Sequence, residues 1–184
     1  MQKKNDEIEI KTMKVGRLET NCYILIKNNK CLIIDPGDEA EKIVDKVGKN
    51  KIVAILITHG HFDHVGALKK IVDKYNCEVY KYENLEEKEY LIDQFKFKII
   101  FTPGHSSDSV TYYFEDCNKM FCGDFIFREN IGRCDLPTGN LDIMYESISK
   151  IKKYNNIDVL PGHGDFTTID YEKEHNIYFK TRVY

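Results

Sequence analysis

The sequence predicts a mixed α/β (α+β) fold in which two β-sheets pack on each other and helices cover their outer faces. Strand-like segments dominate each half of the chain, and amphipathic helical segments interrupt them without strict alternation. Strict alternation would instead predict a doubly wound parallel sheet. The 184 residues suffice for one sizeable core, and no repeat or linker divides them, so we expect a single domain spanning residues 1–184.

The expected elements follow from the period of the apolar residues and from turn signals between them. Strands are expected over residues 8–15, 22–26, 31–34, 52–57, 78–81, 95–101, 109–114, 118–122 and 157–160. Helices are expected over residues 40–47, 65–75, 140–154 and 170–179. Residues 52–57 (IVAILI) are wholly apolar, which is typical of a strand buried on both faces.

Composition excludes several classes of protein. Hydrophobic residues make up 42% and charged residues 31% of the chain, which is typical of a globular protein. The net charge is −3 and basic residues are not clustered, so we expect no nucleic-acid partner. Residues 1–10 lack the features of a signal peptide, and no apolar run approaches ~20 residues, so we expect no membrane segment and a cytoplasmic location. The six cysteines form no CxxC pair and are expected to be reduced, mostly buried side chains.

The segment Thr58-His59-Gly60-His61-Phe62-Asp63-His64 carries the strongest chemical signal. It places four strong metal ligands within six residues, directly after the buried strand. Imidazole and carboxylate are ligands that suit zinc, iron and related metals. The alternative is that Asp63 caps a helix beside unrelated surface histidines. Half of the six histidines of the chain lie in this segment, which favours a metal site.

Three further residues extend this set. His105 and His163 each follow an apolar strand and a Pro-Gly turn, so the same strand-end geometry is expected to bring both to one edge of the fold. Asp124 also ends an apolar strand, and its two carboxylate oxygens could bridge two metals. Spacing alone does not select Asp124 over Asp116 or Asp135.

The order HxHxDH, PGH, GD and GH resembles the metallo-β-lactamase superfamily, and within it the glyoxalase II-like (hydroxyacylglutathione hydrolase-like) branch. The motifs Asn21-Cys22-Tyr23, Asp35-Pro36-Gly37 and Ile131-Gly132-Arg133-Cys134-Asp135-Leu136-Pro137 also match the branch. The resemblance implies a four-layer αββα sandwich with two divalent metal ions at one edge of the sheets. Zinc is the expected metal, with iron and manganese as alternatives.

The resemblance also implies a role for each residue of the set. His59, His61 and His105 would hold the first metal. Asp63, His64 and His163 would hold the second, and Asp124 would bridge the two. Asp35 matches a position that supports the metal-binding loop without itself binding a metal.

The chain departs from the branch in three places. Ser106-Ser107-Asp108 stands where Thr-x-Gly is common, and Ile177 stands where a proline is usual. Only 21 residues (184 − 163) follow His163, where classical glyoxalase II enzymes carry a helical domain that helps to bind glutathione. The expected relative is therefore a glyoxalase II-like enzyme without the C-terminal helical domain.

The expected reaction is hydrolysis of small (hydroxy)acyl thioesters. Two cations can lower the pKa of a shared water toward ~7, and the resulting hydroxide would attack the acyl carbonyl. Asp63 is the expected catalytic residue, which orients this hydroxide and accepts its proton. Arg133 is expected to bind a substrate carboxylate, with a surface salt bridge as the alternative. The oligomeric state is left open.

Other activities of the same superfamily are alternatives. A persulfide dioxygenase has similar motifs but uses one iron, so metal stoichiometry separates it from a hydrolase. A β-lactamase, lactonase, phosphodiesterase or nuclease would share the fold. His64 and Asp124 disfavour the β-lactamases that use a Cys ligand, and the lack of a basic surface disfavours a nuclease. A non-enzymatic redox module is disfavoured because His61 stands where the diiron redox proteins have Glu.

Overall fold

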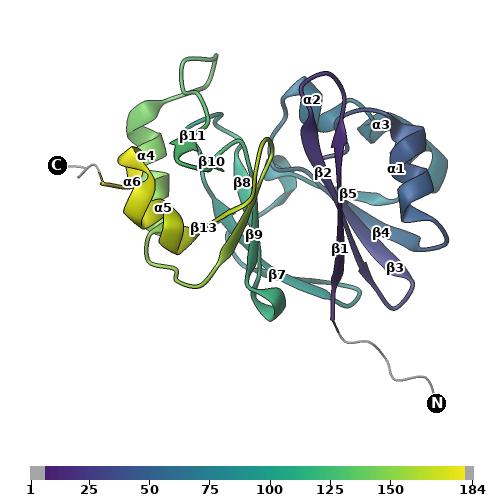
Figure 1. Cartoon of the computed structure of the whole chain (residues 1–184). Coiled ribbons are helices and arrows are strands. Elements are labelled where there is room, and N and C mark those ends of the chain that lie inside the picture. The colour runs from purple at the N-terminus through teal and green to yellow at the C-terminus, as the bar shows by residue number, and fades with distance from the viewer. Residues whose placement is uncertain (1–6, 181–184) are drawn as a thin grey trace.

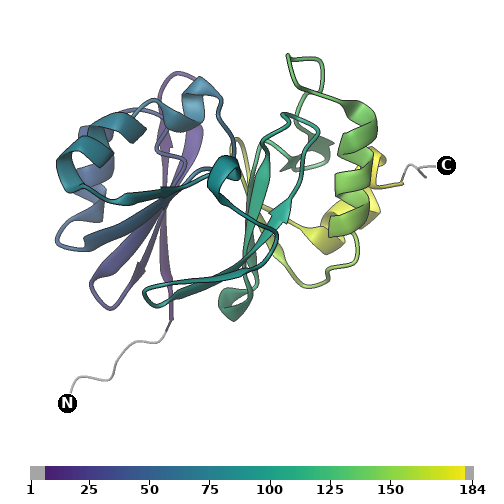
Figure 2. The same cartoon turned by 180° about the vertical axis from the view of Figure 1, so that it is seen from behind.

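Two β-sheets face each other in the structure, a computed structural model that describes residues 7–180. Helices α1 (Ala40–Val47), α2 (Phe62–Val65) and α3 (Leu68–Tyr75) lie on the outer side of one sheet. Helices α4 (Leu141–Ile151), α5 (Ile169–His175) and α6 (Ile177–Lys180) lie on the outer side of the other (Figure 1 and, from behind, Figure 2). The predicted four-layer αββα sandwich is confirmed.

The first sheet has the strand order β1-β2-β3-β4-β5. Its strands are β1 (Glu9–Val15), β2 (Thr20–Lys27), β3 (Lys30–Ile34), β4 (Lys51–Leu56) and β5 (Glu78–Tyr80). The second sheet has the order β13-β12-β9-β8-β7-β6. Its strands are β6 (Glu89–Ile92), β7 (Phe95–Phe101), β8 (Val110–Phe114), β9 (Lys119–Gly123), β12 (Asp158–Pro161) and β13 (Thr167–Thr168). A separate hairpin joins β10 (Ile126–Phe127) and β11 (Asn130–Ile131).

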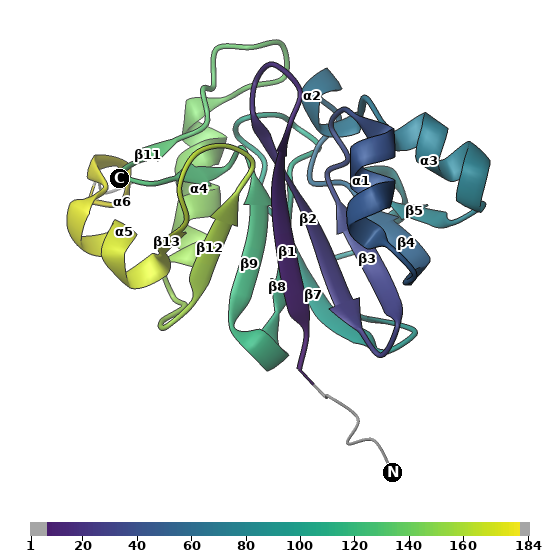
Figure 3. The same cartoon turned by 45° about the vertical axis from the view of Figure 1, so that its right-hand side comes forward.

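The directions of the strands decide where the functional loops lie. In the first sheet, β3, β4 and β5 run parallel. In the second, β7 and β9 are both antiparallel to β8 and so run the same way, and β12 is parallel to β9. The carboxyl ends of β7, β9 and β12 therefore meet at one edge of their sheet. Figure 3 shows α2, which follows β4, and the loop before α4 at the same edge of the sandwich.

Three apolar clusters hold the four layers together. The cluster between the sheets is rich in aromatic side chains, among them Tyr23, Phe97 and Phe121. A second cluster packs the first sheet against α1 and α3, and a third packs the second sheet against α4 to α6. Strands with both faces covered explain the wholly apolar run at 52–57, of which Ala54, Ile55 and Leu56 are inaccessible to solvent.

The structure differs from the predicted elements in three ways. The helix expected over 65–75 is two helices, because the chain turns at Gly66, where an added Cβ would lie 2.3 Å from the carbonyl oxygen of Gly37. The helix expected over 170–179 is also two, α5 and α6, separated at Asn176. The short strands β6, β10, β11 and β13 were not predicted.

Two expectations from composition can be compared with the structure. The six cysteines are free; Cys22, Cys31 and Cys122 are buried, whereas Cys77, Cys117 and Cys134 are partly exposed, so the prediction of mostly buried side chains holds for half of them. Among residues 7–180, no helix has the length and apolar character that crossing a membrane would require.

Candidate metal centre

All seven residues predicted as metal ligands converge on one site at the carboxyl ends of the strands. Their donor atoms form three overlapping groups, within each of which the atoms lie no more than 4.8 Å apart. The groups are His59, His61 and His105; His59, His64 and Asp124; and Asp63, His64 and His163. Residues up to 104 positions apart (163 − 59) thus meet because the four strands that precede them, β4, β7, β9 and β12, end at this edge.

The first group consists of three ring nitrogens that face one another. Nδ1 of His61 lies 3.0 Å from Nε2 of His59 and 2.9 Å from Nε2 of His105. A ring nitrogen offers either one hydrogen or one in-plane lone pair, so Nδ1 of His61 cannot make a well-formed hydrogen bond to both neighbours. Three imidazole nitrogens that converge on one point are the arrangement that a first-row metal cation requires.

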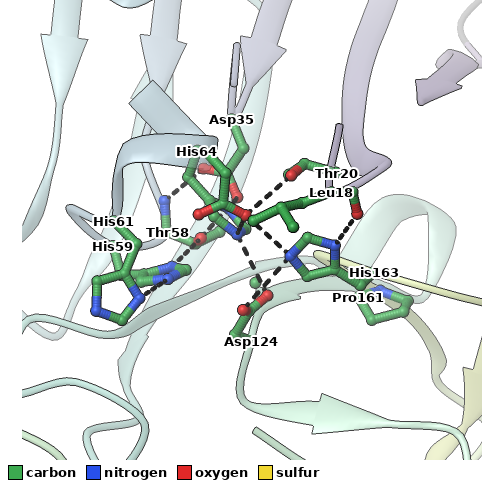
Figure 4. A network of polar contacts seen from close by, with 12 residues as sticks. Leu18, Thr20, Asp35, Thr58, His59, His61, His64, Asp124, Pro161 and His163 are labelled. Atoms are coloured by element: carbon green, nitrogen blue, oxygen red, sulfur yellow. Dashed lines mark hydrogen bonds and ion pairs between the residues drawn. The ribbon is translucent and has the colours of Figure 1, made fainter. Parts of the chain in front are cut away.

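The group of Asp63, His64 and His163 combines imidazole with carboxylate. Nε2 of His163 lies 3.1 Å from Oδ2 of Asp63, and Nε2 of His64 lies 3.6 Å from the same oxygen. Asp124 lies between the groups. Its Oδ1 lies 3.3 Å from Nε2 of His64 (Figure 4), and its Oδ2 lies 3.6 Å from Nε2 of His105. Asp124 is therefore placed to contact cations in both groups.

Two buried atoms test whether these residues fit metal ions. Nε2 of His64 and Oδ1 of Asp124 have no hydrogen-bond partner among the described residues, although they lie 3.3 Å apart. An unsatisfied buried polar group costs about 1–3 kcal/mol. A cation between the groups would satisfy both atoms, so the donor set fits a dinuclear centre.

Four of the five histidines of the site have a second ring nitrogen that contacts an oxygen. The pairs are His59 Nδ1 with Thr58 Oγ1 at 3.1 Å, His64 Nδ1 with Asp35 Oδ2 at 2.8 Å, His105 Nδ1 with the Arg133 carbonyl at 2.8 Å, and His163 Nδ1 with the Leu18 carbonyl at 3.0 Å. Each contact with a carbonyl or carboxylate fixes a hydrogen on Nδ1, which leaves the lone pair of Nε2 for a metal.

Asp35 organises the loop behind the centre, in agreement with its predicted supporting role. Its carboxylate accepts hydrogen bonds from the backbone N–H of Thr58 at 2.8 Å, from the Thr58 hydroxyl at 2.6 Å and from His64. The side chain is buried, and its backbone has φ +50°, a conformation that Asp and Asn tolerate better than most residues.

The pKa values of the candidate ligands are shifted in different directions across the site. Burial opposes the charged form of His64, but the carboxylates of Asp35 and Asp124 outweigh it and raise its pKa to about 10. Burial and the neighbouring imidazoles hold the pKa of His59 well below its ordinary value. Burial also opposes ionisation of Asp63, but His163, His64 and Thr20 outweigh it and lower the pKa of the carboxyl. At neutral pH Asp63 is therefore an anion.

The structure decides between the alternatives left open by the sequence. Asp63 does not cap a helix, because α2 begins after His61 with no side-chain cap and the Asp63 carboxylate contacts Thr20 and His163 instead. Asp135 pairs with Arg133, and Asp116 precedes β9, at the opposite end of that strand from Asp124.

Sequence reasoning missed three residues that support the site. The Thr20 hydroxyl donates to Oδ2 of Asp63 at 3.0 Å. The amide of Asn21 donates to the carbonyls of Pro161 and Gly164, both at 3.1 Å, and so holds the loop of His163. Asp108 accepts from the backbone N–H of Gly60 at 2.9 Å, between His59 and His61. In the sequence, only the motif Asn21-Cys22-Tyr23 and the departure at Ser106-Ser107-Asp108 pointed to two of these three residues.

A cleft of about 1140 Å³ lies over the donor atoms. Arg133 lines it as predicted, but its guanidinium makes a bidentate pair with Asp135, with both N–O distances at 2.7 Å. The side chain is mostly exposed, which corresponds to the surface salt bridge considered as the alternative. Its contribution through the backbone, the carbonyl that holds His105, was not predicted.

Known proteins are similar to this chain in sequence. "Probable metallo-hydrolase YqgX" of Bacillus subtilis is 34% identical over 200 residues, which cover 89% of this chain and 94% of that protein. "Hydroxyacylglutathione hydrolase GloC" of Haemophilus influenzae is 28% identical over 211 residues, which cover 95% of this chain and 100% of that protein.

Two solved structures superpose closely. The B3 metallo-beta-lactamase BLEG-1 gives a TM-score of 0.90 at 30% identity and covers 94% of this chain and 100% of its own. TTHA1623, in a di-iron-bound form, gives 0.83 at 30% identity and covers 91% of this chain and 99% of its own. The sequence profile of the metallo-beta-lactamase superfamily matches residues 15–89 and 81–163. The chain, with its sandwich and its cluster of His and Asp donors, belongs to the metallo-beta-lactamase superfamily.

Proposed function

We propose that the protein is a metal-dependent hydrolase that cleaves small (hydroxy)acyl thioesters. The observation that carries this proposal is the set of seven residues with nitrogen and oxygen donors, five of which line one cleft, with Asp124 between two groups. The names of the similar proteins from Bacillus subtilis and Haemophilus influenzae, a probable metallo-hydrolase and a hydroxyacylglutathione hydrolase, support it.

We assign the metal ligands from the same groups. His59, His61 and His105 would hold one cation, and Asp63, His64 and His163 the other, with Asp124 shared between them. Bound there, the two cations would supply Lewis acidity, which makes water nucleophilic at neutral pH and offsets negative charge on an acyl oxygen. The donors are all nitrogen or oxygen, so zinc, iron and manganese are all suitable, and the di-iron form of TTHA1623 is an example of iron.

Asp63 is the residue we assign to proton transfer. Its carboxylate lines the cleft and is ionised at neutral pH because His163, His64 and Thr20 favour the anion over the opposing effect of burial. Thr20 holds Oδ2 in place, so Asp63 can orient a water molecule and accept its proton. Arg133 remains a predicted ligand of a substrate carboxylate, and it must first release Asp135.

β-Lactam hydrolysis is the second candidate, because BLEG-1, a B3 metallo-beta-lactamase, superposes over nearly the whole chain. A chromogenic cephalosporin and a thioester of a small thiol are assayed side by side on the same preparation. Preference for the thioester by at least ~10²-fold in kcat/KM supports the proposal, and the reverse preference would replace it.

Metal analysis tests the centre independently of substrate. We expect two metal ions per chain, and loss of thioester hydrolysis on chelation with recovery on adding zinc, iron or manganese. One tightly bound iron per chain, together with oxygen consumption in the presence of a persulfide, would support a dioxygenase in place of a hydrolase.

A further inference from the structure

The cleft above the metal donors has apolar walls on both sides. Leu18, in the turn between β1 and β2, and Phe62, at the start of α2, are 53% and 75% exposed. The cleft is also lined by Phe127 on β10, Ile131 on β11 and Leu136 in the loop before α4. Single exposed apolar side chains are ordinary on a protein surface, but a cleft lined by several of them is typical of a site for an apolar ligand.

These walls begin at the metal donors themselves. The ring of Phe127 lies 6.2 Å from the ring of His163, centroid to centroid. Ile131 precedes Gly132, where an added Cβ would lie only 1.7 Å from the carbonyl oxygen of Asp124 and 3.1 Å from the ring of His105. The segment that carries Ile131 is therefore pressed against the centre, and a group held on this wall is next to the donors.

The charges of the cleft do not suit an anionic ligand. Apart from the five predicted metal ligands that line it, the charged residues of its described lining are Arg133 and Asp108. The guanidinium of Arg133 already binds both oxygens of Asp135. Asp108 adds a negative charge, and its carboxylate accepts from the N–H of Gly60. A glutathione conjugate, with two carboxylates, would find no unpaired cationic side chain among these residues.

We propose that the substrate is a thioester with an uncharged, apolar acyl chain on a neutral thiol, bound with the chain along Phe62, Leu18 and Phe127. This inference rests on the proposed thioesterase function. It narrows the acyl group and the thiol to uncharged ones, and it therefore replaces the predicted role of Arg133 as ligand of a substrate carboxylate. In the reaction, the oxygen of water bonds to the acyl carbon and the carbon–sulfur bond breaks. Its electron pair stays on sulfur, which takes one of the two protons of water, so that a thiol, a carboxylate and one free proton result.

The test is a chain-length series on one neutral thiol. The metal-loaded protein is assayed with acetyl, butyryl, hexanoyl and octanoyl thioesters of N-acetylcysteamine, and with lactoyl-glutathione. Complete transfer of a methylene from water would raise kcat/KM about 4-fold, so we expect a rise of about 2- to 4-fold per methylene until the cleft is filled. Lactoyl-glutathione should be a poorer substrate than the hexanoyl thioester by at least ~10-fold.

Variants on the walls locate the effect. Phe62→Ser and Leu18→Ser should each reduce the octanoyl-to-acetyl ratio of kcat/KM by about 5-fold or more. Both side chains are exposed, so neither change removes a core contact. The matched control is Leu91→Ser on β6, which is 70% exposed and does not line the cleft, and this ratio should be unchanged in it.

A binding measurement separates this inference from the proposed function. Titration calorimetry compares two thioethers that cannot be hydrolysed, S-hexyl-N-acetylcysteamine and S-hexylglutathione. We expect the neutral thioether to bind at least ~10-fold tighter, and to lose this advantage in Phe62→Ser. A flat chain-length profile, or preference for the glutathione compounds, overturns the apolar cleft and leaves thioester hydrolysis standing. Failure to hydrolyse any thioester, with the neutral thioether still preferred, overturns the proposed function and the thioester substrate with it, and leaves only the apolar cleft as a binding site standing.

Discussion

The carboxylate of Asp35 accepts a hydrogen bond from Nδ1 of His64 at 2.8 Å, and both side chains are buried. This contact directs Nε2 of His64 toward Asp124. Asn has nearly the size of Asp and, like Asp, tolerates the backbone φ of +50° at this position. Asp35→Asn therefore removes mainly the charge that orients His64. We expect a 10- to 100-fold loss of metal affinity, measured by competition with a chelator. Asp45→Asn, on the exposed face of α1, is the control, and equal affinities in the two variants would contradict the role of Asp35.

The stability of the metal-free protein should fall as the pH rises above neutrality. The pKa of His64 is raised from 6.5 to about 10 because Asp35 and Asp124 outweigh its burial. A raised pKa stabilises the folded state fully below the unfolded value, and this stabilisation is lost as the pH rises from 6.5 through about 10. The lowered pKa values of Asp63 and Asp124 act in the opposite sense, since their stabilisation is present above 3.8 and lost below it.

His59 and His105, whose pKa values are lowered, disfavour the folded state below 6.5, so the metal-free protein should be most stable near pH 6.5. Urea unfolding with a chelator present, followed by far-UV circular dichroism from pH 4 to 10, measures this. With metals bound, the proton of His64 must leave, so metal affinity should increase over the same range. A metal-free urea midpoint that rises between pH 6.5 and 10 would show that the carboxylates do not hold a proton on His64.

Asp63→Asn tests the residue assigned to proton transfer. An amide oxygen can still accept from Thr20, so the position of the side chain should be kept while its charge and basicity are lost. We expect kcat to fall by at least ~10²-fold, the lower range for loss of a general base. Metal content is measured on the same sample, and Asp73→Asn on the exposed face of α3 is the control. Near wild-type turnover with both metals retained would exclude Asp63 from the reaction.

Gly162→Ala should damage the metal centre specifically. A Cβ at this position would lie 2.3 Å from Oδ1 of Asp124 and 2.6 Å from Cε1 of His64, so both side chains must move. We expect a loss of metal affinity of at least ~10²-fold, as for loss of a ligand contact. Gly164→Ala is the matched control, since nothing lies within 4 Å of its added Cβ and its positive φ costs only about 1 kcal/mol of stability. Equal metal content in the two variants would show that the centre tolerates the shift.

The metal donors could be predicted because each lies in a short motif directly after an apolar strand. The Pro-Gly turns before His105 and His163 follow β7 and β12, whose parallel course brings both residues to one edge. That course depends on the strand order, which periodicity does not encode. The residues that orient the donors were missed for a related reason. Thr20 and Asp63 are 43 positions apart, and the Arg133 carbonyl is 28 positions from His105.

The elements that were missed are short and depend on tertiary contacts. Strands of two to four residues, such as β13 and β6, are too short for an alternating pattern to be detected. The expected helix over 65–75 was wrong at Gly66 and Ala67, where the chain turns between α2 and α3 and Gly66 lies against the carbonyl of Gly37. The hairpin of β10 and β11 is likewise fixed from outside, by α5.

Glu172, on α5, makes the contacts that fix this hairpin. It is fully buried, and its carboxylate accepts from the backbone N–H of Glu129 at 3.0 Å, from the amide of Asn176 at 2.7 Å and from the hydroxyl of Thr167. The amide of Asn176 also donates to the carbonyl of Asn130 at 2.9 Å. Glu129, between β10 and β11, and Asn130, the first residue of β11, are thus both tied to the end of α5.

Glu172→Ala would leave these donors buried without an acceptor, and one such group costs about 1–3 kcal/mol. We therefore expect a loss of about 3 kcal/mol in the free energy of unfolding, measured by urea titration with far-UV circular dichroism because the chain has no tryptophan. Glu174→Ala, exposed on the same helix, should change it by less than about 0.5 kcal/mol. A loss below about 1 kcal/mol in Glu172→Ala would mean that water or a shift of the hairpin satisfies the donors, and the hairpin would then not depend on this carboxylate.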